Sequence, residues 1–239
     1  MTTNNILNIV RQTAIISIMG VAMTFVISTA EIDLSVGSIA ALSSLTSAMA
    51  LEAGFGMIGA IVAGLGTGFL IGLINGLLVT KVIIPSFLVT LGMMGVTKGL
   101  AMWVTNTAPV PIIDKTFVYI FGSGDVGGIP VLLFWTVIAV VLGHVVLRKT
   151  AFGRRTLATG GNQSAARFSG VNVTKTKLYV LIGSGVMAGL AGCCMRDGCT
   201  PDGTPSAREM NCPLSLPLFW EAPVCSEVSV RSSGPSSDR

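Results

Sequence analysis

The stretch RKTAFGRRTLATGGNQSAARFSGVNVTKTK, residues 148–177, decides the fold class of this chain. It holds seven Lys and Arg and no Asp or Glu, and it separates two apolar runs, VLLFWTVIAVVLGHVVL (131–147) and LYVLIGSGVMAGLAGCC (178–194). Runs of about 17–25 apolar residues can cross a bilayer as helices. Because Lys and Arg are retained on the cytosolic side, this basic loop is predicted in the cytosol. Its small, polar interior, GGNQSAARFSG (160–170), suits docking to a soluble partner.

The composition of the whole chain also indicates that its solvent is a bilayer. Of its 239 residues, 51% are hydrophobic and only 11% are charged, whereas a soluble domain is usually about 25% charged. The net charge of +4 is concentrated in the basic loop, and 6% aromatic residues offer no stacking platform for bases, so no nucleic-acid partner is predicted. The sequence therefore predicts an all-α, polytopic transmembrane helical bundle. About six candidate spans are expected, at residues 13–30, 34–51, 55–80, 84–104, 131–147 and 178–194.

The basic loop also predicts the orientation of the other segments. Counting spans back from it places Lys81 inside, residues 105–130 outside and residues before 13 outside. The N-terminus lacks the basic region and cleavage site of a signal peptide, so the first apolar run should stay in the membrane. An external start without a signal peptide indicates that an earlier span is missing.

Four polar residues are candidates for a translocation path through the bundle. Asp33 lies in EIDLSVG (31–37), between the first two spans, and acids at membrane depth are costly and often functional. The alternative is that Asp33 braces or caps the following helix. Asn75, Thr90 and Asn106 are candidates by chemistry alone, and each is equally suited to a hydrogen bond between helices.

The third span carries glycines at intervals of four residues, which fall on one helix face: Gly64, Gly68, Gly72 and Gly76. This pattern favours close packing against a neighbouring helix over a role in lining a substrate path.

Other motifs carry little chemistry. GSGDVG (122–127) matches G-x-G-x-x-G, but no strand precedes it and Pro130 follows, so a flexible external loop is predicted. His144 is the single histidine, which favours a packed or interfacial role over a proton relay. The five cysteines contain no C-x-x-C pair, and no P-loop sequence exists. No catalytic residue, metal site or bound cofactor is therefore predicted, and the chain is not expected to be an enzyme.

Three stretches together resemble the permease subunits of bacterial ABC sugar importers of the ribose/xylose/galactose type. They are GVAMTFVISTAEIDLSVGSIAALSS, INGLLVTKVIIPSFLVTLGMMGVTKGLAMWVT and TAFGRRTLATGGNQSAARFSGVNVTKTKLYVLIGSGVMAGLAG. Each would be weak evidence alone, but they occur in the family's order and cover roughly residues 5 to 195. The resemblance predicts a multi-pass protein of the bacterial inner membrane, in a family that typically has about ten spans.

The resemblance also implies partners. They are a second permease copy, two cytosolic ABC ATPase subunits that bind the ATP, and a periplasmic sugar-binding protein. In this family a cytosolic loop forms a coupling helix that contacts the ATPase. That role carries over onto Gly161, Asn162, Ala165, Ala166, Arg167, Ser169 and Gly170.

The resemblance ends near residue 195, which divides the chain into a partial permease domain (1–195) and a tail (196–239). The tail is rich in Ser, Pro and Cys, and its composition is typical of disordered sequence. One permissible back-translation of residues 207–234, read two bases later, gives an acidic-apolar loop, an apolar run and a Gly-rich turn like those of the family. A frameshift upstream of residue 207 is therefore our hypothesis for the tail, and the chain alone is not expected to transport.

Two other classes of protein stay open at this point. An ion-coupled secondary transporter would use Asp33 or Lys98, and its uptake would persist without ATP. A non-functional membrane fragment would neither transport nor bind an ATPase. The coupling-loop motif argues against the first of these.

Overall fold

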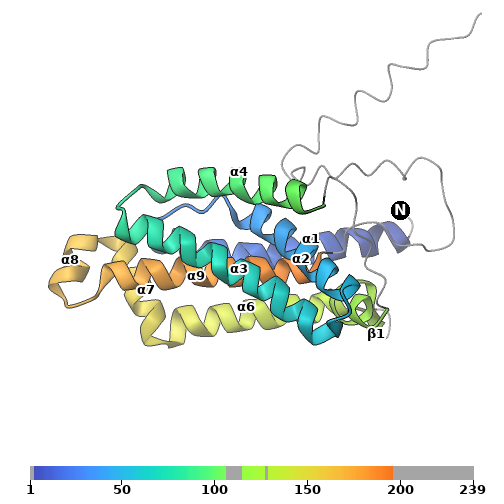
Figure 1. The fold of residues 1–239 in the computed structure, drawn as a ribbon. Helices are drawn as coiled ribbons and strands as arrows, with labels where there is room; N and C mark the ends of the chain where they lie inside the picture. The colour runs from blue at the N-terminus through green and yellow to red at the C-terminus, as the bar shows by residue number, and fades with distance from the viewer. Residues whose placement is uncertain (1–2, 106–114, 127–128, 196–239) are drawn as a thin grey trace, which may run out of the picture.

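The computed structural model describes residues 3–105, 115–126 and 129–195, and its architecture is a bundle of long helices (Figure 1). The helices are α1 (Thr3–Ile27), α2 (Val36–Glu52), α3 (Gly56–Lys81), α4 (Ser86–Thr105), α5 (Lys115–Phe117), α6 (Val131–Lys149), α7 (Ala151–Gly161), α8 (Gln163–Phe168) and α9 (Val173–Cys194). A short π-helix, η1 (Val118–Ser123), and two antiparallel two-residue strands, β1 (Asp125–Val126) and β2 (Ile129–Pro130), connect α5 to α6.

Four helices are long and apolar enough to cross a membrane, namely α3, α4, α6 and α9. Two shorter apolar helices, Thr13–Ile27 within α1 and the whole of α2, account for the other two predicted segments. The prediction of an all-α helical bundle is confirmed. The boundaries differ from those expected, because α2 begins two residues later than predicted and α9 begins at Val173, within the basic loop.

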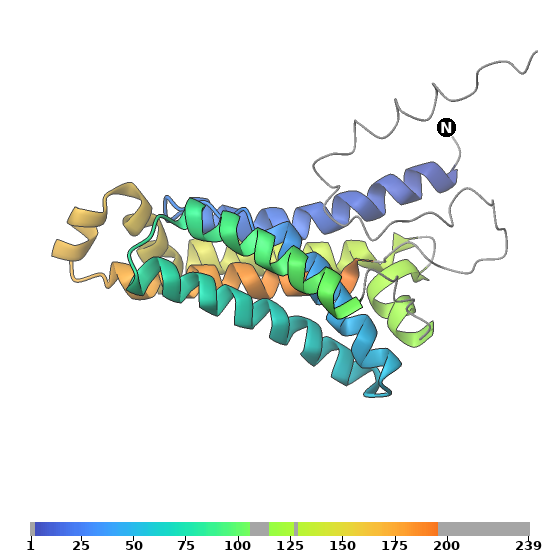
Figure 2. The same cartoon turned by 45° about the horizontal axis from the view of Figure 1, so that its top comes forward.

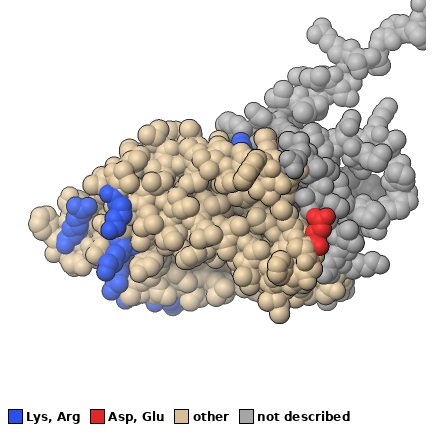
Figure 3. Space-filling view, viewed as in Figure 1, with Lys and Arg blue, Asp and Glu red and all other residues tan. Residues whose placement is uncertain are grey.

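The long helices run roughly along one axis, and α7 and α8 extend beyond one end of the bundle (Figures 1 and 2). Basic side chains gather at this end, which we call the basic end, and acidic atoms are visible at the other (Figure 3). The last turns of α3, α6 and α8 supply Lys81, Arg148, Lys149 and Arg167. Since Lys and Arg are retained on the cytosolic side, the basic end is the expected cytosolic face.

The closest helix pair is α3 with α9, which run antiparallel. Gly68 and Gly72 face Gly185 and Gly189, and a Cβ added at Gly68 would collide with the Gly185 carbonyl oxygen. Small residues let two helix backbones approach this closely. The prediction that the glycine face packs against a neighbouring helix is confirmed, and we call this contact the glycine seam.

The first and second spans are joined by a non-helical segment, residues 28–35, whose side chains alternate between the bundle interior and its surface, where Ile32 and Leu34 are 48% and 40% exposed. Thr29, Asp33 and Ser35 in this segment are all at most 2% exposed. The second crossing is therefore a broken span, in which the 17-residue α2 is preceded by irregular backbone. Irregular backbone at membrane depth is tolerated only where protein groups satisfy its hydrogen bonds.

At the end opposite the basic loop, aromatic stacking fixes η1 against the start of α6. The Phe121 ring stacks on Phe117 and on Trp135, with centroid separations of 5.2 and 5.0 Å. The Trp135 Nε1–H donates to the Ile120 carbonyl at 3.1 Å. The predicted flexible loop at 122–127 is therefore wrong for its described part, because η1 and β1 give this region regular structure.

Candidate functional site

Four polar side chains meet inside the bundle and form a cluster that we call the polar hub: Asp33, Ser35, Asn75 and Ser184. The Asp33 Oδ1 accepts from the Ser35 amide at 2.9 Å and from the Ser35 hydroxyl at 2.6 Å. The other carboxylate oxygen, Oδ2, accepts from the Ser184 hydroxyl at 2.9 Å. The Asn75 Nδ2 donates to the Ser35 Oγ at 2.9 Å. The hub thus joins the broken span to α3 and α9.

The polar hub is sealed from the surface of this chain. Asp33 is 2% exposed and Asn75 is 0% exposed. Asn75 lies six residues before Lys81, which places it about 9 Å into the bundle at 1.5 Å rise per residue. Within the described part of the chain, the Asn75 Oδ1 has no hydrogen-bond partner and Asp33 has no ion-pair partner. A buried polar atom without a hydrogen-bond partner is uncommon in folded proteins.

The start of α4 also contacts the broken span. The Ile32 amide donates to the Ser86 Oγ at 3.2 Å, and the Thr90 hydroxyl lies 3.4 Å from the Ile32 carbonyl oxygen. Thr90 is completely buried and makes its shorter bond, 2.9 Å, to the Ser86 carbonyl of its own helix. The structure therefore brings together three of the four predicted path residues, Asp33, Asn75 and Thr90. Asn106 lies outside the described residues.

Asp33 was predicted either to line a translocation path or to brace the following helix. Its carboxylate binds the amide at the start of α2, so it braces that helix, although Ser35 rather than Asp33 occupies the N-cap position. Asn75 likewise makes a hydrogen bond between elements, as its structural interpretation required. The clustering of these groups around a broken span is a feature that the sequence did not reveal, because the contact between Asp33 and Ser184 spans 151 residues.

The mouth of the broken span is tied to the basic end. Lys177, at the start of α9, forms an ion pair with Glu31, and their side chains are 16% and 11% exposed. Ala30 adopts a φ of 58°, a left-handed conformation that is uncommon for a residue with a Cβ. The strained turn and the ion pair therefore hold the segment where it enters the bundle.

The predicted coupling loop folds as two helices, α7 and α8, joined at one residue. Asn162 ends α7 and begins α8, and its Oδ1 accepts from the Ser164 and Ala165 amides at 3.0 and 3.1 Å. Its side chain is an N-cap that fixes the angle between the two helices. Gly170, with a φ of 81°, ends the loop in a conformation that glycine adopts readily.

The surface of the loop is accessible along its length. The exposed members of the predicted set are Gly161, Asn162, Ala165, Arg167, Ser169 and Gly170. Ala166 is instead 4% exposed and anchors α8, with its carbonyl accepting from the Val171 amide at 3.0 Å. Phe168, which was not predicted from the sequence, is 93% exposed at the end of α8. An aromatic residue beside a basic one in a cytosolic loop could have indicated it.

The loop is in backbone contact with the segment that carries Asp33. A Cβ added at Gly160, near the end of α7, would collide with the Ser28 carbonyl oxygen, so the two backbones are in close contact. Ser28 precedes the strained Ala30, the paired Glu31 and the buried Asp33 along the same segment.

The remaining candidates occupy structural positions. His144 is on the exposed surface of α6, and Cys193 and Cys194 are buried, unpaired cysteines at the end of α9. Among residues 3–105, 115–126 and 129–195, no group of three or more His, Cys, Asp or Glu could hold a metal ion. Lys98 and Asp33 form no ion pair with each other in this part of the chain.

Comparison with known proteins identifies the family. Residues 5–199 match the family model described as branched-chain amino acid transport system / permease component. Over 189 residues the chain is 43% identical to the ribose import permease protein RbsC of Bacillus subtilis (strain 168), covering 79% of this chain and 59% of that protein. It is 38% identical over 194 residues to RbsC of Escherichia coli (strain K12), covering 80% and 60%.

A third relative is the L-arabinose ABC transporter permease protein AraH of Azospirillum brasilense, 35% identical over 192 residues, with 80% of this chain and 56% of that protein covered. The chain thus spans about 60% of the length of the relatives it matches. No solved structure gives a significant match. The resemblance to ABC sugar-importer permeases is confirmed, and the chain is a multi-pass protein of the inner membrane that belongs to the branched-chain amino acid transport system / permease component family.

Proposed function

We propose that this chain is a permease subunit of an ATP-driven monosaccharide importer, docked to its ATPase through α7 and α8. The observation that carries the proposal is the position of α7 and α8 at the basic end: α8 is exposed there, and α7 contacts the broken span through Gly160 and Ser28. The matched relatives are named for the import of ribose and for L-arabinose, which favours a pentose as the substrate.

The chemistry of α8 fits a protein partner. Phe168 is 93% exposed, and large apolar side chains that enter a partner's pocket often carry much of the binding energy. Arg167 beside it adds a charged donor for a carboxylate on the partner. ATP would be bound by that partner, with no cofactor in this chain.

The polar hub provides a route by which docking would influence the bundle. Closure of the two ATPase subunits would displace α7 and α8, and the contact at Ser28 would move the broken span. Asp33, Asn75, Thr90 and Asn106 are then the proposed polar residues of the translocation path. Carboxylate and amide groups are suitable partners for sugar hydroxyls, and the unpartnered Asn75 Oδ1 is an acceptor that a sugar hydroxyl would reach once movement of the broken span opens the hub.

A binding measurement tests the docking. The purified chain in detergent is mixed with the ATPase subunit that its genome encodes beside a sugar-binding protein. Phe168→Ala should weaken binding by about 2 kcal/mol, roughly 30-fold. Phe134→Ala, which removes a 49% exposed side chain from the membrane face of α6, is the matched control and should leave the affinity unchanged. Equal affinities for the two variants would count against the docking surface.

A transport assay tests the path and the competence of the chain. With the ATPase and the binding protein in liposomes, this 239-residue chain is expected to show no ATP-dependent sugar uptake. Robust uptake would refute that expectation, and Asn75→Ala would then be expected to reduce it. Uptake that persists without ATP would favour the ion-coupled alternative.

The proposal for residues 196–239, which lie outside the described part, is that they are translated in a shifted frame. Sequencing the coding DNA decides this. A shifted frame that encodes no acidic-apolar loop and Gly-rich turn would overturn it.

A further inference from the structure

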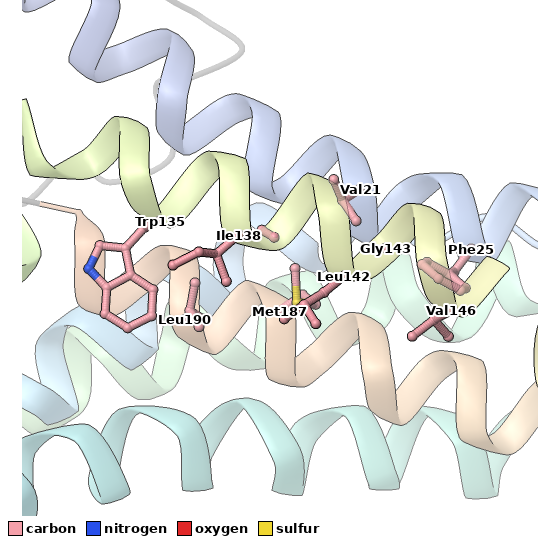
Figure 4. Close-up of a pocket in the computed structure, with 10 residues that line it drawn as sticks. Val21, Phe25, Trp135, Ile138, Leu142, Gly143, Val146, Met187 and Leu190 are labelled. Atoms are coloured by element: carbon pink, nitrogen blue, oxygen red, sulfur yellow. The ribbon is translucent and has the colours of Figure 1, made fainter. Parts of the chain in front are cut away.

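A second feature of the bundle lies on the side away from the glycine seam, between α6 and its neighbours. An apolar cavity of about 230 Å³ is lined by α1, α6 and α9, with Trp135 at one end and Val146 at the other (Figure 4). Phe25, Gly143 and Met187 also face it. All ten lining residues are apolar. We call this cavity, together with the second cavity that continues it toward α7, the α6 groove.

The α6 groove continues toward the basic end. A second cavity of about 150 Å³ shares Phe25, Val146 and Met187 with the first and reaches Phe152 of α7. From Trp135 to Val146 the groove follows eleven residues of α6, or about 17 Å at 1.5 Å per residue. It is therefore a long, narrow channel that ends beside the first turn of α7.

The groove is open at the outer surface of the described bundle. Ile138 and Leu142, which line it, are 49% and 59% exposed. Its volume is too small to seat another helix, since a helix with its side chains is about 10–12 Å in diameter. A single flexible hydrocarbon chain is the occupant whose width and polarity match.

The mouth of the groove near α7 is basic. Arg148 and Lys149 follow Val146 by two and three residues, and Arg155 lies three residues, about one helical turn, beyond Phe152. All three are exposed, and residues 131–161 contain no Asp or Glu. Basic residues at the cytosolic surface attract anionic lipid headgroups.

We propose that the α6 groove is a binding site for an anionic phospholipid of the cytosolic leaflet. One acyl chain lies along α6 between α1 and α9, and the phosphate group binds the basic side chains Arg148, Lys149 and Arg155. The lipid closes the gap between α6 and α9 and so stabilises the α6 side of the bundle. Neither the proposed translocation path nor ATPase docking requires this lipid, although the second cavity also borders Ser184 of the polar hub.

Lipid binding to the purified full chain in detergent tests the proposal, with native mass spectrometry and the thermal unfolding midpoint as readouts. Dioleoyl-phosphatidylglycerol is compared with dioleoyl-phosphatidylcholine, which has the same acyl chains and no net charge. Phosphatidylglycerol should bind the wild-type chain more tightly and raise its unfolding midpoint further. Equal binding of the two lipids would overturn the proposal.

Two sets of variants separate the parts of the site. Ala139→Leu fills the groove and should abolish phosphatidylglycerol binding, whereas Val137→Leu, on the exposed surface of α6, should not. Arg148→Gln with Arg155→Gln should weaken phosphatidylglycerol binding roughly 10- to 30-fold. Lys98→Gln, a charge removal on α4, is its control.

Other outcomes contradict the proposal. If Ala139→Leu leaves lipid binding intact, the acyl chain lies elsewhere. If it changes the oligomeric state instead, the groove holds part of a second copy. Should Ala139→Leu fail to fold, Leu142→Trp can cover the groove from its exposed rim, and unchanged binding in that variant would also overturn the site.

Discussion

The two sides of α9 are packed in different ways. On the side toward α3, glycines of the two helices face each other and the backbones are in contact. Buried hydrogen bonds also join Ser43 of α2 to α3 and Ser184 of α9 to Asp33. Toward α6, large apolar side chains leave a groove of about 230 Å³, and only Leu132 and Ala139 of α6 are buried. In a bilayer, helices gain little from hydrophobic burial against one another, so close backbone contact and hydrogen bonds decide which pairs are tight. Backbone contact therefore fixes the position of α3 against α9, whereas the side chains between α6 and α9 have space to rearrange.

The largest effect is expected at the glycine seam. In Gly68→Ala the new Cβ meets the Gly185 carbonyl oxygen, a backbone atom that cannot rotate away. Overpacking of this kind should lower the free energy of unfolding by about 3 kcal/mol. Unfolding in mixed detergent micelles by titration with sodium dodecyl sulfate measures the change.

Gly66→Ala is the control for this substitution. It lies on the same helix, and an added Cβ has no atom within 4 Å. It should be neutral or stabilise by about 0.5–1 kcal/mol, because alanine favours the helix. Equal losses in the two variants would show that the seam does not carry the difference.

A smaller loss is expected at the polar hub. Asp33→Ala removes the acceptor for the Ser35 amide, the Ser35 hydroxyl and the Ser184 hydroxyl, and leaves them buried. Stability should fall by about 2 kcal/mol, the typical cost of leaving buried donors unsatisfied. Thermal unfolding followed by circular dichroism tests this.

Asp33→Asn serves as the control at this position, since its remaining carbonyl oxygen can still accept from Ser35. It should lose less than the alanine variant. If the alanine variant is as stable as the wild-type chain, the hub does not hold the broken span in place.

The ion pair between Glu31 and Lys177 should contribute less to the free energy of unfolding than the polar hub does. A double-mutant cycle with Glu31→Gln and Lys177→Gln isolates the interaction between the two charges, which we expect at about 1 kcal/mol because both side chains are mostly buried. The coupling energy should fall in high salt. A coupling energy of zero would mean that the pair does not link segment 28–35 to α9.

The smallest effect is expected where α1 meets α6. In Gly143→Ala the new Cβ meets a methyl group of Val21, a side-chain atom, rather than backbone, so a small shift between the two helices relieves the contact. The loss should be below about 1 kcal/mol. A loss as large as that of Gly68→Ala, in the same titration, would show that α6 is packed as tightly against α1 as α3 is against α9.

Much of the helical arrangement could be predicted because its signals are local. Hydropathy over 131–147 and 178–194 located α6 and α9, and the glycine period of α3 revealed a packing face. The basic loop between them was predicted to lie in the cytosol, and the family resemblance implied a coupling helix within it; the loop folds as α7 and α8. The regular structure of 118–126 was missed, since it depends on stacking of Phe121 with Trp135, which is distant in sequence.

The candidate site was predicted as separate residues but not as an assembly. Asp33, Asn75 and Thr90 were singled out because polar groups are rare in spans, which is a property of each position. Ser184 was not, because a serine in a helix of small residues carries no distinct signal. Phe168 was missed because its exposure depends on how α8 is placed on the rest of the chain.

By itself, the sequence determined that this protein is a helical membrane bundle, which end carries the positive charge, and that it resembles sugar-importer permeases. These follow from residue composition and from the period of a helix, which do not depend on distant contacts. Only the tertiary structure decided that α9 is the partner of the glycine face, that segment 28–35 enters the bundle, and that a groove runs along α6. The physical reason is that these features depend on contacts such as that of Asp33 with Ser184, made across 151 residues, which no local pattern specifies.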